Sequence, residues 1–429
     1  MSLSFGSQRG IDWTPTRICM VFWKLADYLN PLFLLFAVLI TMHHTKLSTT
    51  NLIPSGPRRQ THLQRILSSH MTRLLGAAIA SSVLLAACGG GGDSSQDAAA
   101  VANRARRNPS TPATTPATTP TTPATTGKIF YGVNGHFQQG GAYATSSTQT
   151  QLAQLQDLGM TIYRSDVSSK AAATALAQIA TTMAAGGVTV YPVLLISPQE
   201  YASETASYNA GYALGQQVAS AMHASYYEVG NELEADTLAG NYDGTFATDY
   251  VNSKFMIARG AIRGMIDGIK SVDTQGKIVM GAGTWLHWGF DQMLAQGTQP
   301  DGTAGHPVVS WDVTAWHWYN DYDDIQNICG GSGCYNVLSK LQAFGKPIWL
   351  TEYGVRPWTA TDSQAASYLT GGTMMAEYAS VASKYNLQSI QMYELYDDPA
   401  GTYGLLQSDG KTKKSQYSSV KSFIASHPQ

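Results

Sequence analysis

Hydrophobic and polar residues alternate in a regular way along residues 128–429. Short runs rich in β-branched and aromatic residues, typical of buried strands, are followed by longer stretches with the apolar spacing of a helix, such as 148–159, 172–187 and 249–270. Several of these stretches end in glycine, as helix C-termini often do. The segments predicted as strands are residues 128–137, 161–167, 188–196, 226–232, 277–283, 313–319, 347–354 and 387–397.

Eight strand–helix units in one domain favour an α/β fold of the (β/α)8 TIM-barrel type over an open, doubly wound sheet. No glycine-rich dinucleotide or phosphate loop follows the first predicted strand. A last amphipathic stretch, residues 415–425, would complete the ring of helices. Because the active sites of such barrels lie at the C-terminal ends of the strands, we expect the functional residues there.

The chain before residue 128 has a different character. Residues 71–88 read MTRLLGAAIASSVLLAAC, with Arg73 ahead of an apolar run and small residues at its end, which is typical of a secretory signal peptide. The LAAC ending resembles the lipobox of bacterial lipoproteins, which implies lipidation of Cys88. A buried helix is the alternative, disfavoured because the flexible sequence GGGGDSS follows directly. We therefore predict an exported bacterial lipoprotein, held at the outer membrane, the cell surface or in the periplasm.

The segments on either side of this signal differ in their interpretation. Residues 1–70 contain an apolar stretch at 32–42 that is shorter than the ~20 residues of a membrane-spanning helix. We interpret 1–70 as a mis-annotated or unstructured leader, with translation starting at Met71; an additional membrane segment is the alternative. Residues 89–127 form a flexible linker, in which STPATTPATTPTTPATT favours extended polyproline conformations. This disordered linker would hold the domain away from a membrane.

Composition narrows the classes of function. Charged residues make up 13% of the chain and the net charge is −2, so a nucleic-acid partner is not expected. Hydrophobic residues make up 44%, which excludes a chain that is disordered throughout. With 23 Tyr and 9 Trp, the chain is suited to binding sugars. We expect a monomer whose partners are a polysaccharide or oligosaccharide substrate and, through the lipid, a membrane.

Two glutamates end predicted strands. The fourth strand ends in Asn231–Glu232, within YYEVGNELE, and the seventh ends in Glu352, within PIWLTEYG. Glycoside cleavage needs two carboxylates at one mouth, because one protonates the leaving oxygen while the other attacks the anomeric carbon. An Asn–Glu dipeptide alone is a weak signal, whereas two strand-terminal glutamates three strands apart are a strong one.

The motifs YEVGNE and WLTEYG resemble the acid/base and nucleophile motifs of clan A retaining glycoside hydrolases. The segments FYGVNGHF and YGLLQSDGKTKKSQY are most similar to family thirty-nine and its exopolysaccharide-hydrolysing relatives, and the resemblance covers residues 128–429. It implies that Glu232 is the acid/base, that Glu352 is the nucleophile and that Asn231 binds the sugar 2-hydroxyl. The chain departs from the pattern at Gly230, where many members carry Trp, and at Leu233, where Pro is usual.

At the ~5–5.5 Å separation of retaining enzymes, two carboxylates do not easily both carry a charge. We expect Glu352 to be the charged one, held by neighbours such as Arg164 and Tyr319, and Glu232 to keep a proton and serve as the acid.

Other residues at the strand ends are candidates for substrate binding, because aromatic faces stack on sugar rings while amides, imidazoles and charged groups bind hydroxyls. For each aromatic residue, packing within the barrel is the alternative. The expected substrate-binding residues are Asn231, Arg164, Asn134, His136, Trp285, His317, Tyr319, Trp358 and Glu394.

Glu394, in QMYELYDD, is a third carboxylate at the mouth. The TEYG motif favours Glu352 over Glu394 as the nucleophile, so we expect Glu394 to bind a sugar hydroxyl or a cationic group of the substrate. Glu228 and Glu234 are assigned structural or rim positions.

The remaining chemistry is limited. The histidines show no HxH or HExxH spacing, so we expect no metal site, and no cofactor is expected either. Cys329 and Cys334, in CGGSGC, are predicted to form a disulfide because the protein is exported. Closing so short a loop would stabilise the fold by roughly 2 kcal/mol.

The sequence therefore predicts a retaining glycoside hydrolase that cleaves the β-glycosidic bonds of a polysaccharide by double displacement at the cell surface. Two alternatives remain. One is a catalytically silent lipoprotein that binds polysaccharide or mediates adhesion, and the other is a transglycosylase that uses the same two carboxylates. The presence of both carboxylates favours an enzyme.

Overall fold

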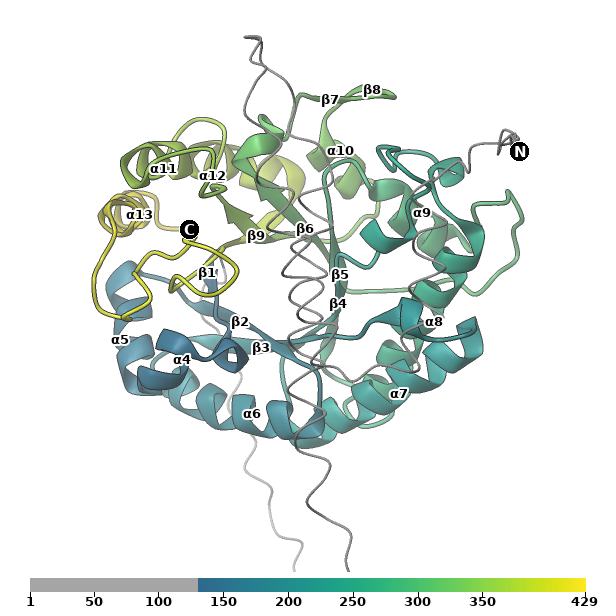
Figure 1. The fold of residues 1–429 in the computed structure, drawn as a ribbon, viewed down its shortest axis with the longest axis horizontal. Helices are drawn as coiled ribbons and strands as arrows, with labels where there is room; N and C mark the ends of the chain where they lie inside the picture. The colour runs from purple at the N-terminus through teal and green to yellow at the C-terminus, as the bar shows by residue number, and fades with distance from the viewer. Residues whose placement is uncertain (1–129) are drawn as a thin grey trace, which may run out of the picture. The chain divides into compact units, whose positions relative to one another are not determined.

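The computed structural model describes residues 130–429, and these form a closed barrel of eight parallel strands (Figure 1). The predicted leader, signal peptide with Cys88, and linker lie outside the described residues. The fold is the predicted (β/α)8 TIM barrel. Its strands are β1 (Tyr131–Asn134), β2 (Ile162–Val167), β3 (Thr189–Leu194), β4 (Tyr226–Asn231), β5 (Lys277–Thr284), β6 (Val313–Tyr319), β9 (Ile348–Gly354) and β10 (Leu387–Met392).

The strands follow one another around the barrel in chain order, and β1 closes the ring against β10 through the pairing of Tyr131 with Ile390. All eight predicted strands are present. The first and last are shorter than expected, since the 3-10 helix η2 (Phe137–Gln139) follows soon after β1 and β10 stops at Met392. Because every strand runs in the same direction, the C-terminal ends all open at one mouth.

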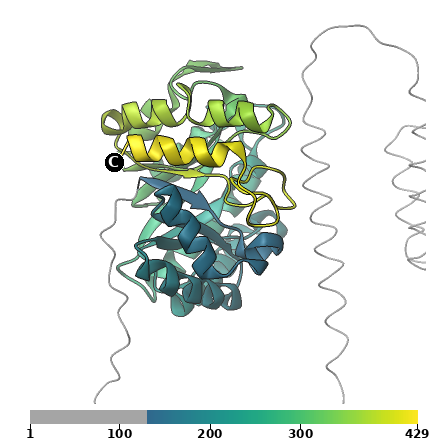
Figure 2. The same cartoon turned by 90° about the vertical axis from the view of Figure 1, so that its left-hand side faces the viewer.

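Helices surround the barrel, and the last helix α13 packs between α11 and α5, which brings the end of the domain next to its beginning (Figure 2). No helix among residues 130–429 is both long and apolar enough to cross a membrane. The helices are α4 (Gly141–Thr145), α5 (Thr148–Leu158), α6 (Lys170–Ala185), α7 (Glu204–Ala221), α8 (Asn252–Lys270), α9 (Trp288–Gln296), α10 (Val337–Gln342), α11 (Asp362–Leu369), α12 (Met375–Tyr385) and α13 (Ser415–Ser426), with short 3-10 turns η3 (Pro198–Glu200), η4 (Ala235–Thr237), η5 (Ala247–Asp249) and η6 (Asn320–Tyr322).

Serine residues begin three consecutive helices on this ring. The side chains of Ser147, Ser169 and Ser203 accept hydrogen bonds from backbone amides in the first turns of α5, α6 and α7. An N-cap of this kind satisfies an amide that has no partner within the helix. These local signals place the helix starts close to where the apolar spacing predicts them.

The barrel interior is filled by side chains rather than open. An apolar cluster of residues on the inward faces of the strands closes its floor, with Tyr191 and Trp349 packed edge to face at 5.7 Å. Above this floor the Tyr191 hydroxyl donates to Gln391 at 2.8 Å. Polar side chains therefore begin inside the barrel, directly beneath the mouth. The floor consists of Ile162, Tyr191, Val279, Ala282, Val313, Ala315 and Trp349.

A two-stranded antiparallel hairpin, β7 (Ile328–Gly330) and β8 (Gly333–Tyr335), lies between β6 and α10. Its paired residues Cys329 and Cys334 form the predicted disulfide. The hairpin is attached to the preceding loops, because Ser332 donates to the Asp243 carboxylate from its amide at 2.8 Å and from its hydroxyl at 2.7 Å. The disulfide thus braces a loop on the mouth side of the barrel.

Helices α7 and α8 pack backbone to backbone at glycines. A Cβ added at Gly264 of α8 would lie 2.1 Å from the carbonyl oxygen of Tyr208, and one added at Gly211 of α7 would lie 2.3 Å from that of Ala261. Both distances are far inside normal contact, and the obstructing atoms belong to the backbone. The close approach of these two helices therefore requires glycine.

We expect Gly264→Ala to lower the free energy of unfolding by about 1–3 kcal/mol, because the added methyl group forces the two helices apart. This loss should appear although alanine favours a helix over glycine. Urea denaturation followed by circular dichroism would measure it. Gly372→Ala is the matched control, since a Cβ there meets nothing within 4 Å. Equal stability of the two variants would contradict the packing argument.

Candidate active site

Arg164, the third of the six residues of β2, is the centre of the mouth. Its side chain is 1% exposed and donates hydrogen bonds to residues from three other strands. Nη1 reaches Asn134 Oδ1 at 2.6 Å and Glu352 Oε1 at 2.7 Å, while Nη2 reaches Asn231 Oδ1 at 2.7 Å. The guanidinium also holds Glu228 with two bonds, at 2.7 and 2.9 Å. Arg164 therefore sets the positions of the carboxylates and amides around it.

Burial by itself lowers the pKa of Arg164, but the charges of Glu228 and Glu352 outweigh it and raise this pKa well above its ordinary value. The guanidinium stays charged, and two buried carboxylates share its charge. Glu228 is fully buried, so it orients Arg164 and does not reach a substrate. Its structural role was expected, but its direct link to Arg164 was not, because no sequence spacing connects the two residues.

Glu352 lies at the end of β9 with its carboxylate nearly covered. One oxygen accepts the bond from Arg164, and the other accepts a bond from the Tyr319 hydroxyl at 2.7 Å. Two donors aimed at one carboxylate fix its orientation. The structure thus places both predicted neighbours on Glu352.

Glu232 follows the last residue of β4, where the chain leaves the barrel wall. Gly230 and Glu232 both have left-handed backbones, with φ of 96° and 47°. A Cβ at Gly230 would also lie 2.4 Å from Leu233, so this position accepts glycine where many clan members carry Trp. The Glu232 side chain is 35% exposed, which makes it the more accessible of the two predicted catalytic carboxylates.

His317 joins the two carboxylates. Its Nδ1 lies 2.9 Å from Glu232 Oε1 and 3.4 Å from Glu352 Oε2. These two oxygens therefore lie no farther apart than the sum of the distances, about 6.3 Å. The imidazole itself is completely buried, and its Nε2 has no hydrogen-bond partner.

The protonation of Glu232 differs from the sequence expectation. Desolvation raises the pKa of this carboxyl, but the hydrogen bond and charge of His317 and the charge of Arg356 lower it to about 2. Burial lowers the pKa of His317, but the charges of Glu352 and Glu232 outweigh it and raise this pKa above its ordinary value. Without substrate, the proton expected on Glu232 therefore belongs to its partner His317.

Asn134 and Asn231 both accept a hydrogen bond from Arg164, but they differ in how much of the side chain remains available to a substrate. Asn134 is 1% exposed, and its amide donates to the carbonyl oxygens of Thr351 and Met392. Both hydrogens of its side-chain amide are used within the protein, so Asn134 orients Arg164 and has no donor left for a sugar. Asn231 is partly exposed beside Glu232, as a ligand of the substrate would be.

His136 and Glu394 lie together on the other side of the mouth, beside β1 and β10. His136 Nδ1 is 3.2 Å from Asp166 Oδ2, and its Nε2 is 3.8 Å from Glu394 Oε2. Glu394 is fully buried, and the Tyr143 hydroxyl donates to it at 3.0 Å. Burial and the charge of Asp398 raise the pKa of Glu394 to about 10. A carboxyl that holds its proton at neutral pH is unsuited to be a nucleophile.

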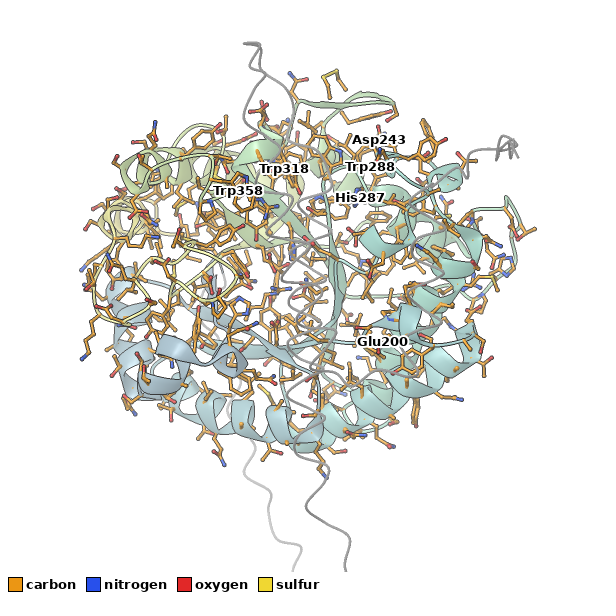
Figure 3. All side chains as sticks on the ribbon, in the orientation of Figure 1. Glu200, Asp243, His287, Trp288, Trp318 and Trp358 are labelled. Carbon is orange, nitrogen blue, oxygen red and sulfur yellow. A yellow bond between two sulfur atoms is a disulfide. The ribbon has the colours of Figure 1, made fainter. Side chains whose placement is uncertain are left out.

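Aromatic side chains line the mouth at two depths. Trp285, after β5, is partly buried and stacks parallel to Trp318 with ring centroids 6.3 Å apart. Trp358, labelled in Figure 3, is 67% exposed beside Tyr403. Trp285 thus belongs to the packing of the wall, whereas Trp358 offers a free ring face.

Two residues of the mouth, Arg356 and Tyr393, were missed at the level of sequence. Arg356 stacks its guanidinium 3.6 Å from the centroid of the Tyr319 ring, and Tyr393 lies edge to face with both His136 and Tyr319. Arg356 stands just after the TEYG motif, which could have marked it. Glu234, beyond β4, was expected in a structural or rim position; it is buried and its Oε1 lies 3.1 Å from His287 Nδ1, which agrees with the structural role.

Residues 287–415 match the model of the family described as glycosyl hydrolase catalytic core. This match confirms the enzyme class predicted from the sequence, a glycosidase. The segment includes His317, Tyr319, Glu352 and Glu394 but begins after the strands that lead to Arg164 and Glu232. A comparison with curated proteins found no significant match.

Solved glycosidase structures resemble the domain only distantly. A family 1 β-glucosidase from Thermotoga maritima has 10% identity and a TM-score of 0.49, covering 70% of this chain and 98% of its own. A GH1 β-glucosidase from Humicola insolens has 14% identity and a TM-score of 0.49, with coverage of 70% and 98%. A GH53 catalytic domain from Ignisphaera aggregans has 14% identity and a TM-score of 0.46, with coverage of 70% and 97%. Similarity this low assigns no function.

We expect His317→Gln to raise the pKa of Glu232 from about 2 to its ordinary 4.5 or above, because the hydrogen bond and charge that lower it are lost while desolvation stays. Carbon-13 NMR titration of carboxyl-labelled glutamate would measure the change, with the Glu232→Gln variant assigning the signal. In Glu232→Gln the pKa of His317 should fall in turn. A Glu232 pKa that stays near 2 without His317 would contradict the assignment of the proton.

Proposed function

We propose that the domain is a retaining glycoside hydrolase that cleaves β-glycosidic bonds in a polysaccharide by double displacement. The observation that supports this best is the bridge of His317 between Glu232 and Glu352. It limits the separation of the bridged oxygens to about 6.3 Å. Retaining enzymes separate their carboxyl groups by about 5–5.5 Å, and inverting enzymes by about 6.5–9.5 Å to admit a water.

Glu352 is the nucleophile in this proposal. Arg164 and Tyr319 each donate to one of its oxygens, so the orientation of the carboxylate is set before substrate arrives. Attack on the anomeric carbon forms a glycosyl ester and removes the negative charge of Glu352.

Glu232 is the acid/base, and His317 is the source of its proton. Substrate that covers the exposed part of Glu232 removes water from it and favours its neutral form. The proton then crosses the 2.9 Å hydrogen bond from His317 Nδ1 to Glu232 Oε1, and passes to the leaving oxygen. The ionised Glu232 next takes a proton from water, whose oxygen attacks the glycosyl ester. His317 is thus a positioning residue that also stores the proton.

An exposed aromatic ring supports an extended substrate. Trp358, which follows β9, presents an exposed ring, and this suits a chain longer than one sugar. We infer a relationship closest to family thirty-nine from the motifs at the two ends of the domain, and a polysaccharide substrate with it. A transglycosylase would use the same residues and differ only in its acceptor.

Substitution of the two carboxylates should separate their roles. Glu352→Ala is expected to abolish hydrolysis of every substrate, because no glycosyl ester forms. Glu232→Ala should lose at least about a hundredfold in kcat/KM on polysaccharide, in line with the ~10²–10⁴ typical of general acid catalysis, but little on the first step with an activated aryl glycoside. Azide should rescue Glu232→Ala with a β-glycosyl azide and Glu352→Ala with the inverted azide, and product NMR distinguishes the two.

Glu200→Ala, an exposed glutamate after β3, is the matched control and should behave as wild type. An inverted azide from Glu394→Ala with an active Glu352→Ala would move the nucleophile to Glu394. Unchanged activity in all three active-site variants would overturn the mechanism. Polysaccharide binding without turnover by the wild type would favour the silent binding protein, and longer products would favour the transglycosylase.

We also propose that the enzyme is an exported lipoprotein, anchored through Cys88 and separated from the membrane by residues 89–127. At about 3.1 Å per residue, an extended linker of this composition reaches tens of ångströms from the membrane. Such a position suits an insoluble or cell-bound polysaccharide.

Cys88→Ser should move the protein from the membrane fraction to the soluble fraction, because the acceptor of the lipid is lost. The circular dichroism spectrum of the barrel should stay unchanged. Fractionation of expressing cells followed by immunoblotting measures the shift. Retention of the variant in the membrane fraction would point instead to an anchor within residues 1–70.

A further inference from the structure

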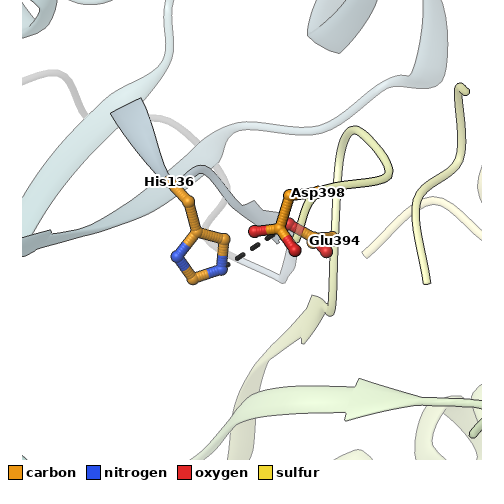
Figure 4. Close-up of side chains that lie close together, drawn as sticks. All are labelled: His136, Glu394 and Asp398. Atoms are coloured by element: carbon orange, nitrogen blue, oxygen red, sulfur yellow. Dashed lines mark ion pairs between the residues drawn. The ribbon is translucent and has the colours of Figure 1, made fainter. Parts of the chain in front are cut away.

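We propose that His136, Glu394 and Asp398 bind one divalent transition-metal ion, best matched by Zn²⁺, at the edge of the mouth (Figure 4). Each residue offers one ligand atom, and these atoms all lie within 4.8 Å of one another. His136 follows β1, whereas Glu394 and Asp398 lie after β10, so the ion would join the first and last strands of the barrel.

Unpartnered polar atoms converge at this place. His136 Nε2, Glu394 Oε1 and Asp398 Oδ2 are each buried without a hydrogen-bond partner. His136 is 6% exposed and Glu394 is 0% exposed. Because buried polar atoms in native proteins are nearly always satisfied, three such atoms in one cluster indicate a ligand between them.

The neighbours of the cluster hold the ligands as metal sites commonly do. Asp166 Oδ2 is 3.2 Å from His136 Nδ1, which makes this nitrogen the N–H donor and leaves Nε2 free to face Glu394. A carboxylate behind a metal-binding histidine fixes its tautomer and its orientation in just this way. The Tyr143 hydroxyl donates to Glu394 Oε2 at 3.0 Å and orients the second ligand.

The chemistry of the three donors selects the ion. Once the ion displaces the proton that Glu394 holds without it, one neutral imidazole and two carboxylates carry two negative charges, which a divalent cation neutralises. Zn²⁺ takes nitrogen and carboxylate ligands at about 2.0–2.2 Å, commonly three of them with one open position. Ca²⁺ prefers six to eight oxygen ligands, which this cluster does not offer. Ligand atoms around a tetrahedral Zn²⁺ lie about 3.4 Å apart, so binding draws the ligand atoms, which lie within 4.8 Å of one another, closer by up to about 1.4 Å.

The ion would act on structure rather than on the bond that is cleaved. His136 packs edge to face with Tyr393 at 5.2 Å, and Tyr393 packs against Tyr319, which donates to Glu352. Tying β1 to the segment after β10 would therefore stiffen the wall beside Glu352. The expectation that the chain holds no metal site rested on short His spacings, and His136 lies far from Glu394 and Asp398 in the sequence.

Isothermal titration of the metal-free full-length chain with Zn²⁺, together with elemental analysis, tests the site. Wild type should bind one more equivalent of Zn²⁺ than His136→Gln, Glu394→Gln or Asp398→Asn, and Asp166→Asn should weaken that binding about 10–100-fold. Histidines elsewhere in the chain contribute equally to every variant, so the difference isolates the cluster. Zn²⁺ should raise the melting temperature of wild type but not of Asp398→Asn.

Glu200→Gln and Glu352→Gln are the controls, and both should keep the bound equivalent. Loss of the ion in Glu352→Gln but not in Asp398→Asn would place the metal at the predicted catalytic pair and overturn the proposal. Equal Zn²⁺ binding by wild type and the three ligand variants would overturn it as well, and would leave Glu394 and Asp398 sharing a proton. These measurements use no substrate, so their outcome is independent of the proposed glycosidase mechanism.

Discussion

The buried charge of Arg164 is the constraint on which the mouth of this barrel depends. A guanidinium taken out of water is tolerated only when it is paired and fully hydrogen-bonded. Arg164 meets this condition by collecting Asn134, Glu228, Asn231 and Glu352 from strands β1, β4 and β9. These strands must therefore come within hydrogen-bond distance of the Arg164 guanidinium. The contacts that satisfy its buried charge are the same contacts that order the site.

On the open side of this network, His317 couples the two carboxylates. Because one imidazole nitrogen faces both Glu232 and Glu352, a change of charge on either one alters the other. The low pKa of Glu232 and the raised pKa of His317 are two descriptions of one shared proton. Formation of the glycosyl ester would remove one negative charge from this group, which is how the same carboxyl can act first as an acid and then as a base.

Rigid surroundings keep these distances short. Helices α7 and α8 meet at glycines, the barrel floor is filled by Tyr191, Trp349 and their apolar neighbours, and a disulfide-linked hairpin braces the loop after β6. The cluster of His136, Glu394 and Asp398 lies at the seam where β1 meets β10. An ion there would close the one part of the mouth where the ligands come from opposite ends of the domain.

The sequence by itself determined the barrel and the residues at its mouth, because the alternation of strands and helices is a local pattern and parallel strands carry their last residues to one end. Glu352, Arg164 and the disulfide were found in this way. Only the tertiary structure decided that Asn134 orients Arg164 and has no donor left for a sugar, that Glu228 and Arg356 belong to the site, and that the proton of Glu232 rests on His317. Each of these depends on the distances between residues far apart in the chain and on the burial of their side chains. Neither can be read from the local sequence.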